Sequence, residues 1–264
     1  MIRKNKDLED IPLSLRTDVD SVAKNPARTT NKRRLELIDA GHYIDSREYN
    51  DRYKLRDIKE KLALIYPTCC FCGIDDQQLE VEHYRPKSKY HWLAYSWDNL
   101  LLSCTVCNKA KKAKFSISGS PVPPKTDRDV TNINCLSCDY DAQEKPLLIN
   151  PEKVTEEELA AFSYHKDGHV SSDNPRVNYT ITTCGLDRKN LVERRRTIWD
   201  KFNAAANQRI YEHRNDPEGL KISIADLVKD FIRDSNDLSL PFTAFRRYAI
   251  EAGWLQSLAD DNNH

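Results

Sequence analysis

Two Cys-x-x-Cys pairs, Cys69/Cys72 and Cys104/Cys107, stand 31 residues apart in this chain. A Cys-x-x-Cys turn brings two thiolates to one point, and two such turns that converge form the tetrahedral sulfur site that Zn²⁺ prefers in proteins. Buried thiols without a metal would have no reason to pair twice at this spacing. The pattern therefore predicts a closed, structural zinc site, whose binding free energy of about 10 to 16 kcal/mol is available to hold a small core together.

The overall composition favours metal binding over disulfide formation. Of the 264 residues, 39% are hydrophobic and 31% are charged. No apolar run approaches the roughly 18 residues that span a bilayer, and no apolar signal-like segment follows the charged start MIRKNKDLED. We therefore expect a cytoplasmic protein without a membrane span, in which the eight cysteines stay reduced.

A third pair, Cys135/Cys138, leaves two alternatives open. It could combine with His165 and His169, whose spacing across a Lys-Asp-Gly turn suits a cross-strand pair, to form a second zinc site. Alternatively, the pair lies in a loop that binds no metal. Cys184, within the apolar stretch ITTCGL, is expected to be buried.

The stretch around the first two pairs is basic although the whole chain is not. The formal net charge of the chain is zero, whereas residues 83–115 contain seven Lys and Arg residues and one Asp, which gives a local net charge of +6. Local positive charge of this kind favours contact with a polyanion such as nucleic acid. Taken alone, the lysines at 109–114 would more often form an ordinary solvated face.

Further motif residues lie between the pairs and directly after them: Glu82-His83, Pro86, Asn99-Leu100, Asn108 and Lys111. Together with the cysteines they resemble the HNH (ββα-metal) endonucleases with zinc knuckles. The resemblance implies an α+β fold, in which a two-stranded antiparallel hairpin and one helix form a zinc-stabilised ββα-metal core surrounded by helices. Asn108 stands where many members have the final His, a departure that puts the affinity for metal in doubt rather than the fold.

The residue types of the motif suit hydrolysis of a phosphodiester bond. The reaction needs a deprotonated water, and a neutral imidazole with a pKa near about 6.5 can take that proton at neutral pH. His83 is therefore expected to be the general base, which explains why it is not used as a zinc ligand. Glu82 and Asn108 would offer two oxygen ligands to one catalytic Mg²⁺ or another divalent cation.

Asn99 and the lysines after the second pair have supporting roles by resemblance. Asn99 would hold the loop after the first strand so that His83 faces the phosphate; alternatively, it only caps a turn. Lys109, Lys111 and Lys112, with Lys114 nearby, are expected to contact substrate phosphates.

The chain is expected to divide into three regions. Residues 1–47 form a polar arm with an isolated apolar IPLSL, residues 48–150 contain the nuclease core, and residues 151–264 are mostly helical. A helix is expected over 48–65, where Tyr49, Tyr53, Ile58, Leu62 and Ile65 recur at roughly helical spacing before Pro67.

Later segments show other periodicities. PLLIN, residues 146–150, is expected to be a short buried strand, and FSYHKDGHV a hairpin around Lys-Asp-Gly. Residues 187–214 and 222–258 have helical patterns. These helices carry apolar residues that we expect to dock a partner, although they could instead pack only against the core: Leu191, Ile198, Trp199, Phe202, Phe231, Phe242, Phe245 and Trp254. The segment PFTAFRRYAIEAGWL combines the Trp, Tyr and Arg that are common in binding hot spots.

Six segments of the chain together resemble the PtuB-type HNH nucleases of Septu and retron-associated phage defence. These segments are IPLSL, EHYRPKS, NLLLSC, EKPLLINP, FSYHKDGHV and TITTCGLDRKNLVERR. That resemblance implies a PtuA-like ATPase partner and a nucleic-acid substrate, DNA in preference to RNA. Two alternatives remain: a non-catalytic zinc-ribbon nucleic-acid binder and a stand-alone HNH restriction nuclease. Base specificity, the activating trigger and the oligomeric state do not follow from the sequence.

Overall fold

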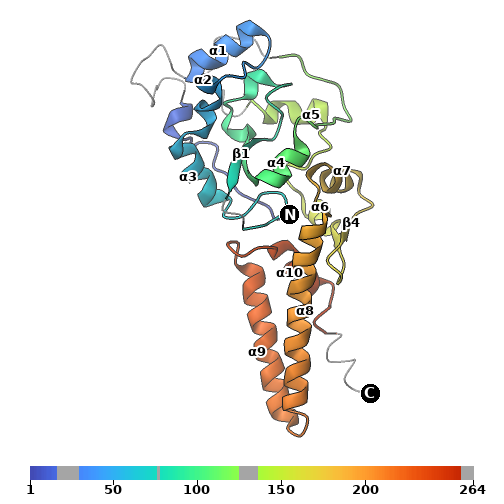
Figure 1. The fold of residues 1–264 in the computed structure, drawn as a ribbon. Helices are drawn as coiled ribbons and strands as arrows, with labels where there is room; N and C mark the ends of the chain where they lie inside the picture. The colour runs from blue at the N-terminus through green and yellow to red at the C-terminus, as the bar shows by residue number, and fades with distance from the viewer. Residues whose placement is uncertain (17–29, 76–77, 125–135, 257–264) are drawn as a thin grey trace.

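The computed structural model describes residues 1–16, 30–75, 78–124 and 136–256. At its centre, β1 (Leu79–His83) pairs antiparallel with β2 (Leu100–Cys104), so that His83 lies opposite Leu100. The helix α4 (Thr105–Lys111) follows β2 directly and packs on the hairpin (Figure 1). All five residues of β2 are buried, as expected for an apolar strand that is covered on both faces. The α+β class and the ββα core are thereby confirmed.

The expected helix over 48–65 is wrong in one respect, because the segment is divided. It forms α2 (Arg47–Asn50), the 3₁₀ turn η3 (Arg52–Lys54) and α3 (Arg56–Ile65). The step from Tyr53 to Ile58 is five residues, which does not keep both side chains on one face of a continuous helix. Leu55 adopts an extended conformation between the pieces, and Tyr53 and Ile58 are both buried.

The described part of residues 1–47 packs against the core. The 3₁₀ turn η1 (Leu13–Leu15) contacts α3, and α1 (Thr30–Ala40) contacts the 3₁₀ turn η4 (His91–Leu93). A further 3₁₀ turn, η5 (Trp97–Asn99), leads into β2. The ammonium of Lys6 is fully buried, 3.0 Å from the carbonyl oxygen of Trp97 and 2.6 Å from the Glu152 carboxylate.

PLLIN does not form the expected strand. The 3₁₀ turn η6 (Cys138–Tyr140) and α5 (Asp141–Glu144) precede it, and Pro146 makes only an isolated bridge with Ile117. Pro146 has no N–H for a longer ladder, and Lys145 before it has a φ of 48°, outside the range of a strand. Leu148 and Ile149 are fully buried, so only the predicted burial is right.

The hairpin predicted for FSYHKDGHV is confirmed as β3 (Ser163–Tyr164) and β4 (Val170–Ser171), after α6 (Glu156–Ala160). The helix α7 (Pro175–Cys184) was not predicted, although its start has a sequence signal. Asn174 accepts hydrogen bonds from two N–H groups of the first turn, and Pro175 occupies the first helical position, where it needs no N–H.

Three helices complete the chain: α8 (Lys189–Glu212), α9 (Pro217–Asn236) and α10 (Thr243–Glu251). The predicted helical regions are thus present, with a break between α9 and α10 inside 222–258. Figure 1 shows α8 and α9 side by side, projecting from the rest of the molecule as an arm, with α10 at the base of that arm. In the described part of the chain, no helix is long and apolar enough to cross a membrane.

The apolar residues expected to dock a partner mostly pack within this region. Ile198 and Trp254 are half-buried, and the others are buried: Leu191, Trp199, Phe202, Phe231, Phe242 and Phe245. Trp199 stacks on Phe202 and meets Trp254 edge-on, with ring centroids 5.6 and 5.1 Å apart. The expectation that the buried members form a docking surface is therefore wrong, because side chains already packed together cannot also contact a partner.

Candidate functional site

The four knuckle cysteines converge as the sequence predicted. Cys69 and Cys72 lie in the turn before β1, Cys104 ends β2, and Cys107 is in the first turn of α4. Their sulfur atoms all lie within 4.8 Å of one another, and those of Cys72 and Cys104 are 3.8 Å apart. Zinc–sulfur bonds of about 2.3 Å in a tetrahedron require sulfur separations of about 3.8 Å. The cluster therefore fits a zinc ion.

The surroundings of the sulfurs match a closed structural site. The backbone N–H of Cys107 donates to Sγ of Cys104 across 3.4 Å, which stabilises a thiolate there. Burial raises the pKa of the Cys69 thiol to about 12, so a bound divalent cation is what would make the thiolate stable at neutral pH. Cys70 and Cys184 are buried nearby without joining the cluster.

His83 occupies the last position of β1 and is only 5% exposed. Its Nε2 lies 2.9 Å from the carbonyl oxygen of Ala94. Because a carbonyl only accepts, the imidazole proton lies on Nε2, and Nδ1 keeps the lone pair that can take a proton. Tyr53 meets the ring edge-on with centroids 4.5 Å apart.

The electrostatic surroundings keep His83 neutral. Burial is the main cause that lowers the pKa of His83 to about 3; the hydrogen bond to Ala94 opposes this shift, and the positive charges of Lys87, Lys111 and Lys54 contribute to it. At neutral pH the imidazole is therefore in its basic form. This is the protonation state that a general base requires before the reaction.

Asn99 connects the two backbone segments that hold His83. Its Oδ1 accepts the N–H of Arg85 at 2.8 Å, and its Nδ2 donates to the carbonyl oxygens of Arg85 and Leu93, each at 3.1 Å. Arg85 follows β1, and Leu93 precedes the Ala94 carbonyl that His83 contacts. Asn99 thus lies where the predicted positioning role needs it, and its catalytic importance remains a prediction.

Glu82 and Asn108 face the contact between β1 and α4. Residues 80 and 82 share one face of the strand, and residues 108 and 111 share one face of the helix. Across this contact Asn108 Nδ2 lies 3.3 Å from Glu80 Oε2, and Lys111 Nζ lies 2.6 Å from Glu82 Oε1. Burial raises the pKa of Glu82, and the Lys111 ammonium opposes that shift. Glu82 Oε2 and Asn108 Oδ1 are oxygens of the type that a hard divalent cation prefers, and their role as ligands stays a prediction.

Lys111 does not lie where a phosphate contact requires it. Its side chain is fully buried, and Nζ donates to Glu82 Oε1 and, across 2.7 Å, to the carbonyl oxygen of His83. The expectation that Lys111 contacts substrate is therefore wrong for this arrangement, because a buried ammonium with two internal acceptors does not reach the surface. Lys109 and Lys112 are exposed on the same helix end and remain available.

Other cations near His83 were missed in the sequence. Lys87 Nζ donates to Asn50 Oδ1 at 2.6 Å and lies 3.9 Å from the centroid of the Tyr43 ring, with 27% of its side chain exposed. Lys54 is exposed and lies over the Tyr53 ring at 5.6 Å. The motif gave no reason to single out Lys54, because only the tertiary structure brings Tyr53 and the neighbouring Lys54 near His83.

Arg85 was also missed, although it lies within EHYRPKS. It is fully buried and pairs with the carboxylates of Glu144 and Asp141, the latter at 2.7 Å. Four aromatic rings surround its guanidinium at 5.0 to 5.9 Å: Tyr84, Tyr90, Phe115 and Tyr140. Arg85 thereby ties the loop that follows His83 to α5.

The second zinc site is not formed by the described residues. The N–H of Cys138 donates to Asp98, whereas His165 contacts Ser171 and His169 contacts Asp187. Among the described residues, the four knuckle cysteines form the only metal-binding group of Cys, His, Asp and Glu. Cys135 lies outside the described residues.

Comparison with known proteins agrees with this geometry. The family model described as HNH endonuclease matches residues 69–114, so this stretch is an HNH endonuclease domain. The chain is 24% identical over 216 residues to Septu protein PtuB of Bacillus mycoides (strain KBAB4), covering 75% of this chain and 67% of the relative. Septu protein PtuB of Bacillus thuringiensis is 36% identical over 70 residues, 26% of this chain and 27% of the relative.

Septu protein PtuA of Bacillus mycoides is 27% identical over 170 residues, which cover 58% of this chain and 22% of that protein. The chain thus spans only about a fifth of this relative and about two thirds of the longer PtuB match. The similarity to HNH nucleases of the PtuB type, inferred from the motifs, is confirmed.

Proposed function

We propose that this chain is a metal-dependent endonuclease that hydrolyses phosphodiester bonds in nucleic acid, with His83 as its general base. The observation that carries the proposal is the contact of His83 Nε2 with the Ala94 carbonyl oxygen, at 2.9 Å. This contact orients the ring and leaves Nδ1 as its proton acceptor. A buried neutral imidazole, fixed in one tautomer next to an acidic residue, suits the removal of a proton from water.

Glu82 and Asn108 are the residues that would hold a catalytic Mg²⁺ or a similar ion. When bound there, such an ion supplies positive charge that stabilises the phosphate and the departing oxygen in the transition state. Lys111 holds Oε1 of Glu82 at 2.6 Å and thereby fixes the carboxylate. Oε2 is then the oxygen of Glu82 that remains for the ion.

Three exposed lysines and the half-buried Lys87 lie around this site and would bind the substrate backbone. Lys109 and Lys112 extend from the end of α4, and Lys54 and Lys87 lie on the side of His83. Contacts of this kind bind phosphates without reading bases. We therefore infer low sequence specificity, with DNA favoured over RNA by the resemblance to PtuB-type nucleases.

The biological role that we propose is that of the nuclease of a Septu-type phage-defence system in the cytoplasm, with a PtuA-like ATPase as its partner. The similarity to Septu proteins PtuB and PtuA supports it. The arm formed by α8 and α9 is our candidate for the partner-binding element. It projects from the nuclease core and exposes Tyr211 and Ile222, by 69% and 64%.

The function is tested with the purified full chain, plasmid DNA and single-stranded DNA and RNA, in Mg²⁺ and in excess EDTA. We expect Mg²⁺-dependent cleavage that falls about 10²- to 10⁴-fold in His83→Ala, with zinc content unchanged. Ala94 loses a hydrogen bond in this variant, so its folding is checked separately by circular dichroism.

Two results would contradict the proposal. Cleavage that persists in EDTA, or a folded His83→Ala that cuts normally, would exclude this mechanism. Binding of nucleic acid without cleavage, with Mg²⁺, Mn²⁺ and the partner ATPase all present, would instead assign the chain as a zinc-ribbon binder.

A further inference from the structure

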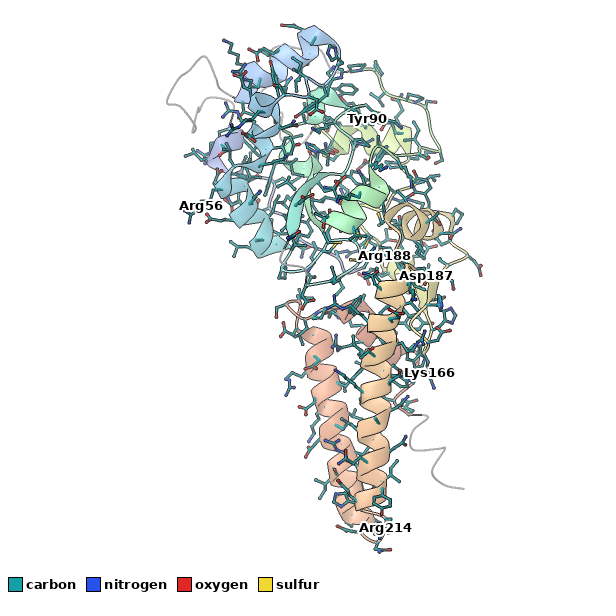
Figure 2. The ribbon with its side chains drawn as sticks, in the orientation of Figure 1. Arg56, Tyr90, Lys166, Asp187, Arg188 and Arg214 are labelled. Carbon is teal, nitrogen blue, oxygen red and sulfur yellow. The ribbon has the colours of Figure 1, made fainter. Side chains whose placement is uncertain are left out.

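Arg188 lies against the knuckle cysteines from a distant part of the sequence. It is the residue that precedes α8, at the junction between the nuclease core and the arm (Figure 2). Its Nη1 lies 3.3 Å from Sγ of Cys107, and its Nη2 lies 3.7 and 3.8 Å from Sγ of Cys72 and Cys104. One guanidinium therefore approaches three of the four sulfur atoms.

The orientation of this guanidinium is not explained by its other contacts. Nη1 also donates to the carbonyl oxygens of Cys184 and Gly185, at 3.4 and 3.0 Å, which end α7. These two bonds would explain the position of Nη1, but they do not explain the position of Nη2. Nη2 has only the sulfur contacts among its hydrogen bonds to described residues, and Nε is buried without a partner there. The side chain thus leaves one N–H unpaired while it directs the other nitrogen to the sulfurs.

The charge of a four-cysteine zinc site gives this arrangement a reason. One Zn²⁺ and four thiolates carry a net charge of −2, and an anion in a buried place is unfavourable unless nearby positive charge and N–H donors compensate it. A guanidinium supplies both, because it keeps its charge at any physiological pH and offers several N–H groups in one plane. Groups that contact metal ligands in this way typically change metal affinity 10- to 100-fold.

We propose that Arg188 is the charge-compensating partner of the zinc thiolates and determines how tightly the nuclease core retains its zinc. Since Arg188 begins α8, the zinc site and the base of the arm are then stabilised by the same side chain. Arg188 contacts the ligands rather than the ion, and it has no part in the proposed catalytic chemistry.

The test compares the full-length wild type with Arg188→Met, Arg188→Lys and the control Lys189→Met. Lys189 is the next residue, its side chain is 89% exposed, and its replacement removes the same unit of charge. The measured quantities are the rate of zinc transfer to a coloured chelator and the rate of thiol modification by a disulfide reagent. We expect zinc transfer to be about 10-fold faster or more in Arg188→Met, intermediate in Arg188→Lys, and unchanged in Lys189→Met.

A second measurement separates zinc retention from simple helix capping. Thermal unfolding is followed at equimolar zinc and in a large excess of zinc. If Arg188 acts through the zinc site, excess zinc restores much of the lost stability, because a ligand that binds only the native state stabilises it by mass action. If Arg188 only caps α7, the loss persists at every zinc concentration.

The proposal is overturned if Arg188→Met keeps wild-type zinc transfer, if Lys189→Met matches Arg188→Met, or if excess zinc restores nothing. If Arg188→Met does not fold, Arg188→Lys decides, since it keeps the charge but loses the planar group of donors. Wild-type zinc transfer and thiol reactivity in a folded Arg188→Lys would then refute the role assigned to the N–H contacts.

Discussion

At the residue scale, Glu82 and His83 are consecutive, yet the pleat of β1 gives their side chains different surroundings. Glu82 faces α4 and pairs with Lys111, whereas His83 faces Tyr53 and the Ala94 carbonyl. The strand ends at His83, so the two groups lie at the end of the hairpin. A carboxylate fixed by a buried lysine and an imidazole kept neutral can therefore serve as ligand and base without sharing one proton.

The buried imidazole predicts a pH-dependent stability. The pKa of His83 is about 3 in the folded chain, against about 6.5 for an ordinary histidine. Between these values the unfolded chain binds a proton that the native state does not, so stability falls as the pH decreases below about 6.5. We expect His83 to lower the free energy of unfolding of the wild type by about 1.4 kcal/mol when the pH falls from 7.5 to 5.5.

Urea unfolding at both pH values measures this cost in wild type and in His83→Asn, whose side chain does not titrate. The difference between the two proteins isolates His83, because other titrating groups are common to both. An equal change in both proteins would mean that the native state accepts the proton at pH 5.5.

The lysines of α4 are predicted to behave differently although they are close in sequence. Lys111→Met leaves the buried Glu82 carboxylate without its partner, so we expect the free energy of unfolding to fall by about 3 to 5 kcal/mol. Lys109→Met removes an exposed charge and should change it by less than about 0.5 kcal/mol.

Urea titrations give both values, and the salt dependence of nucleic-acid binding gives a second readout. We expect Lys109→Met to reduce the slope of log K against log salt by roughly one. A Lys111→Met protein as stable as wild type would refute the buried pair.

At the element scale, the β3–β4 hairpin is held in place by a tip that approaches the backbone of α8 closely. The tip of the β3–β4 hairpin packs on α8, where Arg195 Nε donates to the Gly168 carbonyl oxygen at 2.6 Å. A methyl group at Gly168 would lie 2.1 Å from the Val192 carbonyl oxygen, and its φ of 91° also disfavours other residues. The hairpin therefore needs glycine there to reach α8.

This contact predicts that Gly168→Ala is much more damaging than Gly41→Ala. Gly41 has a positive φ of 70° as well, but a methyl group there meets nothing within 4 Å. We expect Gly41→Ala to cost about 1 to 2 kcal/mol from backbone strain alone. Gly168→Ala should lower the free energy of unfolding by about 1 to 3 kcal/mol more than Gly41→Ala does, because the methyl group also overlaps α8. Thermal unfolding of both variants checks this difference, and equal losses would show that the hairpin is not packed against α8.

At the scale of the whole molecule, the chain combines an HNH-type core, which holds the four-cysteine cluster, with a projecting pair of helices. Deletion from Asp237 onward would test partner docking only if residues 237–256 were not needed for folding. They include Phe245 and Ala249, which are buried at the base of the arm, and Trp254, whose ring meets that of Trp199, so deletion would expose Trp199 and disturb the arm itself. Point substitutions on the exposed surface are the better test.

We predict that Tyr211→Ser combined with Ile222→Ser weakens binding of the PtuA-like ATPase at least about 10-fold, since single hot-spot residues commonly contribute 2 kcal/mol or more. Both lie in the part of the arm away from the core, whose far end is marked by Arg214 in Figure 2. Zinc content and cleavage by the isolated protein should not change. Co-purification quantifies the effect.

Leu64→Ser is the matched control, because Leu64 is 85% exposed on α3 in the nuclease core. If the arm variant binds the ATPase as tightly as wild type, or Leu64→Ser weakens binding equally, the arm is not the docking element.

The sequence by itself determined the two Cys-x-x-Cys pairs and the HNH motif, because their spacings are local and each residue type has a chemical reason, and the resemblance carried by these motifs implied the ββα core. Helical periodicity also identified α8, and the Lys-Asp-Gly turn identified the β3–β4 hairpin. Tertiary structure alone decided which polar groups are buried. It assigned Lys111 to Glu82, placed Lys87 and Tyr53 beside His83, and brought Arg188 to the sulfurs of residues 81 or more positions earlier. Such pairings depend on how distant segments pack, and a lysine or arginine in a sequence carries no sign of whether its charge meets solvent or a buried anion.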